Sequence, residues 1–170
     1  MKEFSTCDLC DAHNAGTDGA FRVLPPAYRD FGGRARFAGM VSTLRVFEDN
    51  SRLKSAVESP GTIDTPNGPV GRVLVVDGGG SLRRALIGGN LAAAAARNGW
   101  VGLVIEGAVR DVAELQACDV GIRALGVVPM PTVKRNEGER DVPVQMQGVW
   151  VRPGDWLYAD ADGIVIMAAT

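Results

Sequence analysis

A chain of 170 residues with 46% hydrophobic and 22% charged side chains has the length and composition of one globular domain, which we predict over residues 1–170. A net charge of −2 gives no electrostatic basis for nucleic-acid binding. Neither a signal-peptide core nor a membrane span of roughly 18 apolar residues is visible, which predicts a cytoplasmic protein without membrane contact. Three cysteines, an odd number, suit a reducing compartment rather than a disulfide framework.

The first predicted element is a short helix over Cys7–His13, with Ser5 or Thr6 as its N-cap. Cys7 and Cys10 form a Cys-x-x-Cys pair, which can bind zinc or take part in redox chemistry. A structural zinc site needs four ligands, and only the third cysteine and the single histidine remain as further soft ligands. The strand that precedes a thioredoxin-like pair is also missing, so an ordinary helix is favoured.

The middle of the chain alternates between strand and helix patterns. Strands are predicted over 37–46, 72–77, 102–106 and 123–128, and helices over 51–58 and 111–117. Residues 82–98 are predicted as two helical pieces that are broken at a glycine pair, with Asn90 near the cap of the second piece. Short strands at 143–147, 149–151 and 163–167 follow, separated by turn residues. The order of elements predicts an α/β fold with a β-rich C-terminal part.

Two loops are similar to ligand-binding motifs but depart from them. Residues 77–81 read Asp-Gly-Gly-Gly-Ser, but a P-loop lysine is missing, and Arg83 stands where the dinucleotide fingerprint requires a glycine. Residues 158–163 are similar to a calcium loop but lack its third acidic position and terminal Glu. We interpret the first as a tight strand-to-helix turn and the second as a hairpin turn.

Gly88-Gly89-Asn90-Leu91 is the first candidate binding segment. A helix N-terminus presents unpaired N–H groups and the positive end of the helix dipole, and two glycines let a carboxylate approach closely. The alternative is a simple helix kink at a glycine pair, and the sequence does not decide between the two.

Arg110-Asp111 follows a predicted buried strand, at the end of the sheet where ligands of α/β folds bind. A carboxylate is a suitable ligand for Mg²⁺ or Mn²⁺, and a guanidinium binds a carboxylate or a developing enolate oxygen. Glu114 lies one helical turn after Asp111 on the same face, where it can hold metal-bound water. The alternative is that Asp111 only caps its helix and pairs with Arg110 at the surface.

Six segments carry a family resemblance: TCDLCDA at 6–12, FGG at 31–33, VDGGGSLRRAL at 76–86, GAVRD at 107–111, GIRALG at 121–126 and GDWLYAD at 154–160. Together they resemble the family of the regulator of ribonuclease E activity A, which includes the 4-hydroxy-4-methyl-2-oxoglutarate (HMG) aldolases. The glycine-serine block and the Arg-Asp pair are specific in combination, and the resemblance covers nearly the whole chain.

This resemblance implies a single-domain β/β/α swivelling-type fold with mixed sheets, and a homotrimer with its sites at subunit interfaces. It also implies a divalent-metal-dependent lyase that cleaves HMG-type 2-oxo acids to pyruvate and decarboxylates oxaloacetate through a pyruvate enolate. By position, the metal ligand would be Asp111, the substrate contacts would be Arg110 and the N–H groups of Gly88, Gly89, Asn90 and Leu91, and the anchor of metal-bound water would be Glu114.

One departure of this chain from the family pattern and one variation among the family members bear on its function. Gly89 stands where some of the aldolases carry an aspartate. Some members that lack the Asp of the Arg-Asp pair bind ribonuclease E, so a non-catalytic trimeric regulator is the alternative function. The presence of Asp111 beside Arg110 favours the lyase, because a protein-binding surface has no need of a metal ligand next to an anion-binding loop.

Overall fold

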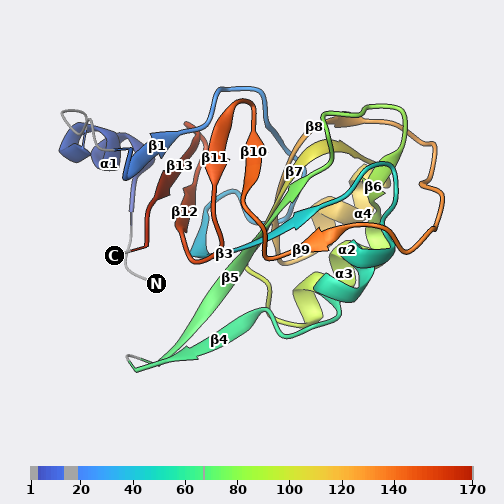
Figure 1. Ribbon diagram of the computed structural model, residues 1–170, viewed down its shortest axis with the longest axis horizontal. Coiled ribbons are helices and arrows are strands. Elements are labelled where there is room, and N and C mark those ends of the chain that lie inside the picture. The colour runs from blue at the N-terminus through green and yellow to red at the C-terminus, as the bar shows by residue number, and fades with distance from the viewer. Residues whose placement is uncertain (1–3, 14–18, 67, 170) are drawn as a thin grey trace.

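The computed structural model describes residues 4–13, 19–66 and 68–169. A mixed sheet forms its centre, with the strand order β1-β13-β12-β3-β5-β7-β8-β2 (Figure 1). The four strands β3, β5, β7 and β8 are parallel, and the short β6 pairs in parallel with the last residues of β7. Their bounds are Phe37–Arg45 (β3), Gly68–Asp77 (β5), Ala85–Ile87 (β6), Gly102–Val109 (β7) and Gly121–Val127 (β8).

Antiparallel strands extend this parallel centre on both sides. On one side β12 pairs with β3, then β13 and β1 follow, and on the other side β2 pairs with β8. β4 and β9 pair with β5 and β3, and β10 and β11 form a separate hairpin. Their bounds are Phe21–Val23 (β1), Arg29–Asp30 (β2), Thr62–Thr65 (β4), Glu139–Arg140 (β9), Val144–Met146 (β10), Val149–Val151 (β11), Trp156–Ala159 (β12) and Ile164–Met167 (β13).

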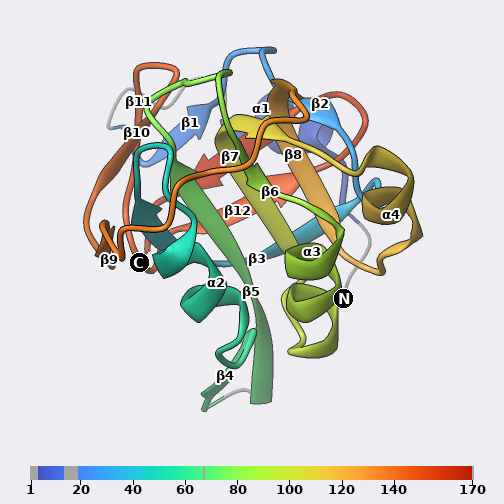
Figure 2. The same cartoon turned by 90° about the vertical axis from the view of Figure 1, so that its right-hand side faces the viewer.

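Alternating residues of the central strands divide the core into two layers. Leu74 and Val76 of β5 pack with the helices α2 (Ser51–Val57), α3 (Gly89–Arg97) and α4 (Val112–Ala117), which cover one face of the sheet (Figure 2). Val73 and Val75 point to the opposite face and pack under the β10–β11 hairpin. The remaining described helix, α1 (Thr6–His13), lies beside β1 and β13 at the far end of the molecule (Figure 1).

Phe37 explains two of the glycines in the sheet. Gly102 and Gly121 lie opposite each other in β7 and β8, and the Phe37 ring packs across both. A Cβ built on Gly102 would lie 2.2 Å from the ring, and one built on Gly121 would lie 2.0 Å from it. No side chain fits there, so the glycines allow the buried ring to lie directly on the backbone.

Most predicted elements are present with bounds shifted by a few residues. The first helix begins at Thr6, where the Ser5 hydroxyl accepts a hydrogen bond of 3.3 Å from the Asp8 N–H. Asp162 and Gly163 form the predicted hairpin turn, here between β12 and β13. The strand β12 itself was not predicted. Pro66-Asn67-Gly68-Pro69 has the composition of a turn, and Asn67 lies outside the described residues.

Residues 82–88 correct the prediction of a helix. Ala85–Ile87 is an extended, fully buried strand beside the end of β7, because pairing with the sheet outweighs the helical propensity of Leu and Ala. The triple-glycine turn therefore leads into a strand and not into a helix, with positive φ at Gly79 and Gly80.

None of the described helices is long and apolar enough to cross a membrane.

Candidate active site

The loop after β7 carries the predicted Arg-Asp pair. The Arg110 N–H donates a hydrogen bond of 2.9 Å to the Ile87 carbonyl, which holds this loop against the end of β6. Asp111 adopts the left-handed conformation with φ 58° and ψ 46°, which few residues other than Gly, Asn and Asp adopt. A strained backbone at a loop of this kind is typical of functional sites.

The Asp111 carboxylate points to a different helix from its own. It makes no capping hydrogen bond to α4, although it stands at the N-cap position of that helix. Instead its Oδ2 atom accepts a hydrogen bond of 3.1 Å from the Gly89 N–H, at the start of α3. The interpretation of Asp111 as a simple helix cap is therefore wrong, and the two candidate segments of the sequence lie in contact.

The start of α3 agrees with the prediction that Asn90 lies near the cap of this helix. Gly88 is the N-cap, with an extended backbone, and Asn90 is the second helical residue. A Cβ built on Gly88 would lie 2.4 Å from Asp111 Oδ2 and 3.1 Å from Arg110 Nε. Gly88 thus allows both functional groups to approach the helix N-terminus, and a larger residue would displace them.

The four predicted N–H donors of this segment are not equivalent. The Gly89 N–H is bonded to Asp111, and the Leu91 N–H donates to the Gly88 carbonyl at 3.1 Å. The N–H groups of Gly88 and Asn90 have no hydrogen-bond acceptor among the described residues. These two donors are therefore available to an anion at the helix N-terminus.

Glu114 lies directly against Gly89. A Cβ built on Gly89 would lie 1.7 Å from Glu114 Oε2 and 2.7 Å from Glu114 Cβ, far inside van der Waals contact. The Glu114 side chain thus occupies the space that any side chain at position 89 would need. A carboxylate remains at this place in the site, although Gly89 itself carries none.

Arg110 and Asp111 also form an ion pair, with 3.6 Å between Arg110 Nε and Asp111 Oδ2. Their side chains are 40% and 38% exposed, and a pair that is open to water to this degree contributes little to stability. This part of the surface-pair interpretation is present in the structure. Both groups remain accessible to a ligand.

The residues around Asp111 fit a hard divalent cation. Its Oδ1 atom receives no hydrogen bond from the described residues, and half-exposed carboxylate oxygen is a suitable ligand for Mg²⁺ or Mn²⁺. The described part of the chain contains no group of three or more His, Cys, Asp or Glu side chains that could hold a metal. A cation bound here would therefore keep several water molecules, as Mg²⁺ usually does.

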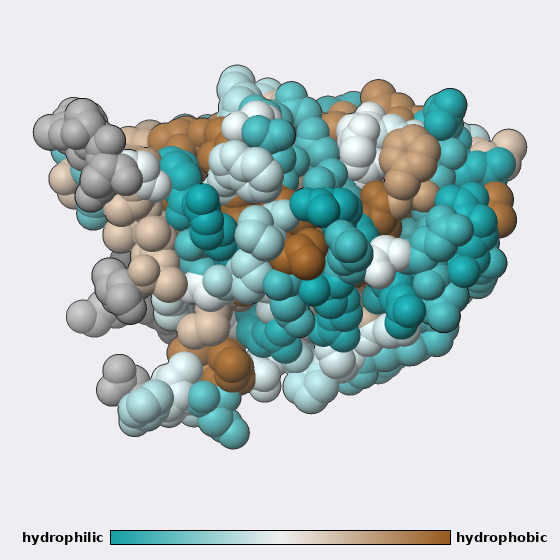
Figure 3. Space-filling model, viewed as in Figure 1, coloured by the Kyte–Doolittle hydropathy of each residue, from teal (hydrophilic) through white to brown (hydrophobic). Residues whose placement is uncertain are grey.

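A cavity of about 250 Å³ opens beside this site. Arg110, Asn90 and Leu91 line it, together with residues of α2, β6 and the segment 131–134. Lys54 and Lys134, which were not among the predicted site residues, also line this cavity. The surface above α2 and α3 is mostly hydrophilic (Figure 3). The rarity of lysine is the one sequence signal that singles out Lys54 and Lys134, since the chain contains only three lysines.

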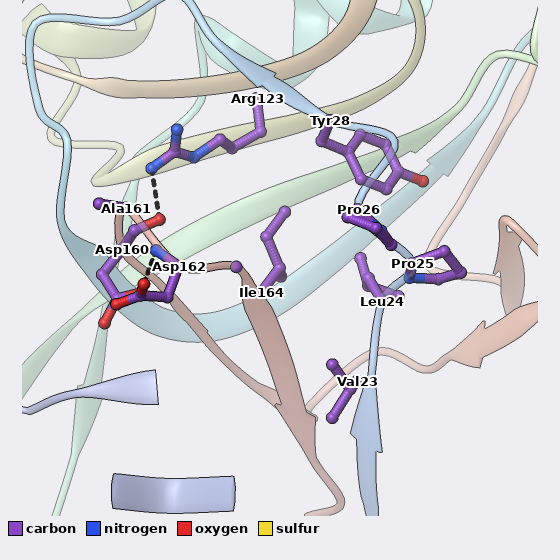
Figure 4. Close-up of a pocket in the computed structure, with 11 residues that line it drawn as sticks. Val23, Leu24, Pro25, Pro26, Tyr28, Arg123, Asp160, Ala161, Asp162 and Ile164 are labelled. Atoms are coloured by element: carbon purple, nitrogen blue, oxygen red, sulfur yellow. Dashed lines mark hydrogen bonds between the residues drawn. The ribbon is translucent and has the colours of Figure 1, made fainter. Parts of the chain in front are cut away.

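A second cavity, of about 300 Å³, lies between the segment 23–28 and the β12–β13 turn (Figure 4). Arg123 lines this cavity. Its guanidinium donates a hydrogen bond of 2.8 Å to the Asp160 carbonyl and forms an ion pair of 3.1 Å with Asp30. None of the predicted site residues lines this cavity. Arg123 connects β8 to the neighbouring loops, so we assign it a structural role.

The cysteines of the Cys-x-x-Cys pair are free, with Cys7 exposed and Cys10 partly exposed. An acidic environment formed mainly by Asp162 raises the pKa of the Cys7 thiol. A raised pKa reduces the thiolate fraction, which is the form that binds metal and attacks disulfides. Their position therefore agrees with an ordinary helix.

The family model described as RraA-like, Aldolase/RraA, matches residues 6–166. The chain belongs to the RraA-like family. It is 67% identical over 165 residues to a protein of Albidiferax ferrireducens named "Putative 4-hydroxy-4-methyl-2-oxoglutarate aldolase", with 97% of this chain and 95% of that protein covered. A Cupriavidus necator protein of the same name is 56% identical, with 95% and 93% covered.

Two solved structures share this RraA-like fold along nearly the whole chain. The RNA-processing inhibitor RraA from Thermus thermophilis has a TM-score of 0.88 and 46% identity, with 98% of this chain and 94% of that chain covered. A Geobacillus kaustophilus structure described as an S-adenosylmethionine: 2-dimethylmenaquinone methyltransferase has a TM-score of 0.85 and 38% identity, with 98% and 96% covered. The predicted mixed α/β fold is confirmed.

Proposed function

We propose that this RraA-like protein is a divalent-metal-dependent lyase that cleaves HMG-type 2-oxo acids to pyruvate and also decarboxylates oxaloacetate. The observation that carries the proposal is the Asp111 carboxylate, held in a left-handed conformation between the α3 N-terminus and Arg110. A carboxylate that suits a metal ion, a helix N-terminus that suits an anion and the Arg110 guanidinium therefore lie together. The relatives named as aldolases support the same reaction class.

In this proposal the chain binds the 2-oxo acid by its carboxylate and keto group. The unpaired N–H groups of Gly88 and Asn90 at the α3 N-terminus would hold the pyruvyl carboxylate. The Arg110 guanidinium would face the keto oxygen, where negative charge develops when the bond between C3 and C4 breaks. Because the backbone N–H groups and the Arg110 guanidinium would be in place before the reaction, these groups would need little reorganisation when the negative charge forms.

Asp111 would hold the cation, and Glu114 would hold one of its waters from the side of Gly89. A bound Mg²⁺ or Mn²⁺ would supply Lewis-acid polarisation of the keto group. Breaking the C3–C4 bond of HMG leaves the enolate of one pyruvate, and loss of the 4-hydroxyl proton gives the second pyruvate. The enolate then takes up a proton at C3. Loss of CO₂ from oxaloacetate yields the same enolate, so both reactions need the same groups.

The test is pyruvate release from HMG and from oxaloacetate, with Mg²⁺ and with EDTA, by wild type and Asp111→Asn. Asparagine tolerates the left-handed conformation but removes the charge, so the fold is expected to persist while metal-dependent turnover falls by at least 100-fold, as for loss of a metal ligand. Circular dichroism checks the fold of the variant. Full metal-dependent turnover by Asp111→Asn would refute the assignment of Asp111.

A second candidate function is a non-catalytic regulator that binds a ribonuclease of the ribonuclease E type. The observation in its favour is the similarity to the RNA-processing inhibitor from Thermus thermophilis, at 46% identity. We propose a homotrimer for both functions, to be checked by light scattering. Inhibition of ribonuclease E cleavage by the protein, together with no pyruvate from either acid, would favour the regulator.

A further inference from the structure

The cavity beside the candidate site is lined by cationic side chains. Three of its lining residues carry a positive charge, namely Lys54, Arg110 and Lys134, and its lining includes no carboxylate. The remaining lining residues are Asn50, Ala85, Asn90, Leu91, Pro131 and Thr132. Two of the three lysines in the whole chain line this one cavity.

The two lysines reach the cavity from separate elements. Lys54 lies on α2, one turn after its N-cap Asn50, whose side-chain amide donates a hydrogen bond of 3.1 Å to the Leu86 carbonyl of β6. Lys54 also pairs with Glu58 one turn further on the exposed side of the helix. Lys134 forms no hydrogen bond or ion pair with the residues that the structure describes.

A buried carboxylate fixes the segment that carries Lys134. Asp49 is fully buried and accepts hydrogen bonds from the N–H groups of Ser51, at 2.7 Å, and of Arg135. Burial raises the pKa of Asp49, but the hydrogen bonds from Ser51 and from the 135–137 backbone lower it below its ordinary value overall. Asp49 therefore stays ionised at neutral pH and ties the Lys134 segment to the start of α2.

We propose that Lys54 and Lys134 bind the second carboxylate of a dicarboxylic 2-oxo acid, the carboxylate remote from the keto group. The inference rests on the proposed function, because the α3 N-terminus and Arg110 then hold the other end of the same molecule. A cavity of about 250 Å³ is at the lower end of the size of small-molecule sites, which suits an acid of four to six carbons. None of the described lining residues is a carboxylate, and Lys54 would exchange or share its pairing with Glu58 when a ligand carboxylate binds. Two such cations would select a dianion over a monocarboxylate.

The experiment compares a dicarboxylate with a monocarboxylate in wild type, Lys54→Met, Lys134→Met and the double variant. The KM and kcat for oxaloacetate decarboxylation report the whole site, and deuterium exchange at the methyl group of pyruvate reports the pyruvyl part alone. Each single variant is expected to raise the KM for oxaloacetate roughly tenfold, as for loss of a charge-assisted hydrogen bond. Pyruvate exchange should stay within about twofold of wild type, since pyruvate has no second carboxylate.

Arg52→Met is the matched control, because it removes one positive charge from the same helix but from a residue that does not line the cavity. If Arg52→Met raises the KM as much as Lys54→Met, the effect is long-range electrostatics and the inference fails. It also fails if the lysine variants lower pyruvate exchange and oxaloacetate turnover equally, because the lysines would then act on the shared part of the site.

Binding measurements separate this inference from the proposed function. Calorimetry with Mg²⁺ compares 2-oxoglutarate, a dicarboxylate, with pyruvate in wild type and in the double lysine variant. Tighter binding of 2-oxoglutarate that the double variant loses supports the lysine subsite even if no acid is turned over. Equal binding of both acids by wild type overturns the subsite, while metal-dependent turnover of oxaloacetate would leave the proposed lyase intact.

Discussion

The contact between Gly89 and Glu114 gives a quantitative prediction for Gly89→Ala. The new Cβ would lie 1.7 Å from Glu114 Oε2 and 2.7 Å from Glu114 Cβ. The carboxylate can rotate away, but the contact with Cβ requires a shift of α3 against α4. Overpacking of this kind costs about 1–3 kcal/mol, whereas replacing a helical glycine by alanine gains about 0.5–1 kcal/mol.

We therefore expect Gly89→Ala to lower the free energy of unfolding by up to roughly 2.5 kcal/mol, with a middle value of about 1 kcal/mol, which lowers Tm by up to about 10 °C for a chain of this length. Glu114→Ala relieves only part of the conflict, because its Cβ remains. Glu114→Gly removes all three close atoms, so in that background Gly89→Ala becomes stabilising by about 0.5–1 kcal/mol. The destabilisation caused by Glu114→Gly itself is present with glycine and with alanine at position 89, so it cancels in this double-mutant cycle.

Urea unfolding followed by circular dichroism measures all four variants of the cycle and the intermediate Glu114→Ala background. Gly163→Ala is the control substitution, because no described residue other than its two chain neighbours has an atom within 4 Å of a Cβ built on Gly163. It should change stability by less than about 0.5 kcal/mol. If Gly89→Ala destabilises the protein equally with glutamate, alanine and glycine at position 114, the contact with Glu114 is not the cause and the reasoning is refuted.

Two further predictions concern the β12–β13 turn and the central sheet. Hydrogen bonds from Thr6 and from backbone N–H groups lower the pKa of Asp160 although its burial raises it, so its contribution to stability is present above the unfolded pKa of about 3.9 and is lost as pH falls through the lower folded pKa. Asp160→Asn should therefore flatten the stability curve measured by urea unfolding between about pH 5 and 2, and an unchanged curve would contradict this. Gly121→Ala should destabilise the protein by about 1–3 kcal/mol in thermal melts because of the Phe37 ring, and Phe37→Leu should reduce that cost; equal cost in both backgrounds would exclude the ring contact.

Much of the site could be predicted from the sequence because its signals are local. The runs of Val, Leu and Ile identify the parallel strands, and Arg110-Asp111 directly follows one of them. Glu114 lies one turn after Asp111, and the Gly88-Gly89 pair marks the start of a helix. Residue type, spacing and the general rule for ligand binding in α/β sheets therefore placed one candidate binding segment and one candidate chemical pair.

The extended strand β6 and its consequences could not be predicted in the same way. Residues 82–88 have helical composition, and only pairing with the end of β7 makes Ala85–Ile87 a strand. The helix α3 begins at Gly89, after that strand, with Gly88 as its N-cap and Asn90 as its second residue. Local propensity differs by less than the free energy of burying three apolar residues, and the tertiary contact decides.

The sequence by itself determined which residues can carry the chemistry: a carboxylate that suits Mg²⁺ or Mn²⁺, a guanidinium beside it, and a glycine pair that admits an anion. The tertiary structure decided which of these groups meet. It brings the Asp111 carboxylate to the Gly89 N–H across 22 residues and sets Glu114 against Gly89. It also gathers Lys54 and Lys134 in the same cavity as Arg110. The physical reason is that contacts between distant segments depend on strand pairing and helix packing, which residue spacing along the chain does not encode.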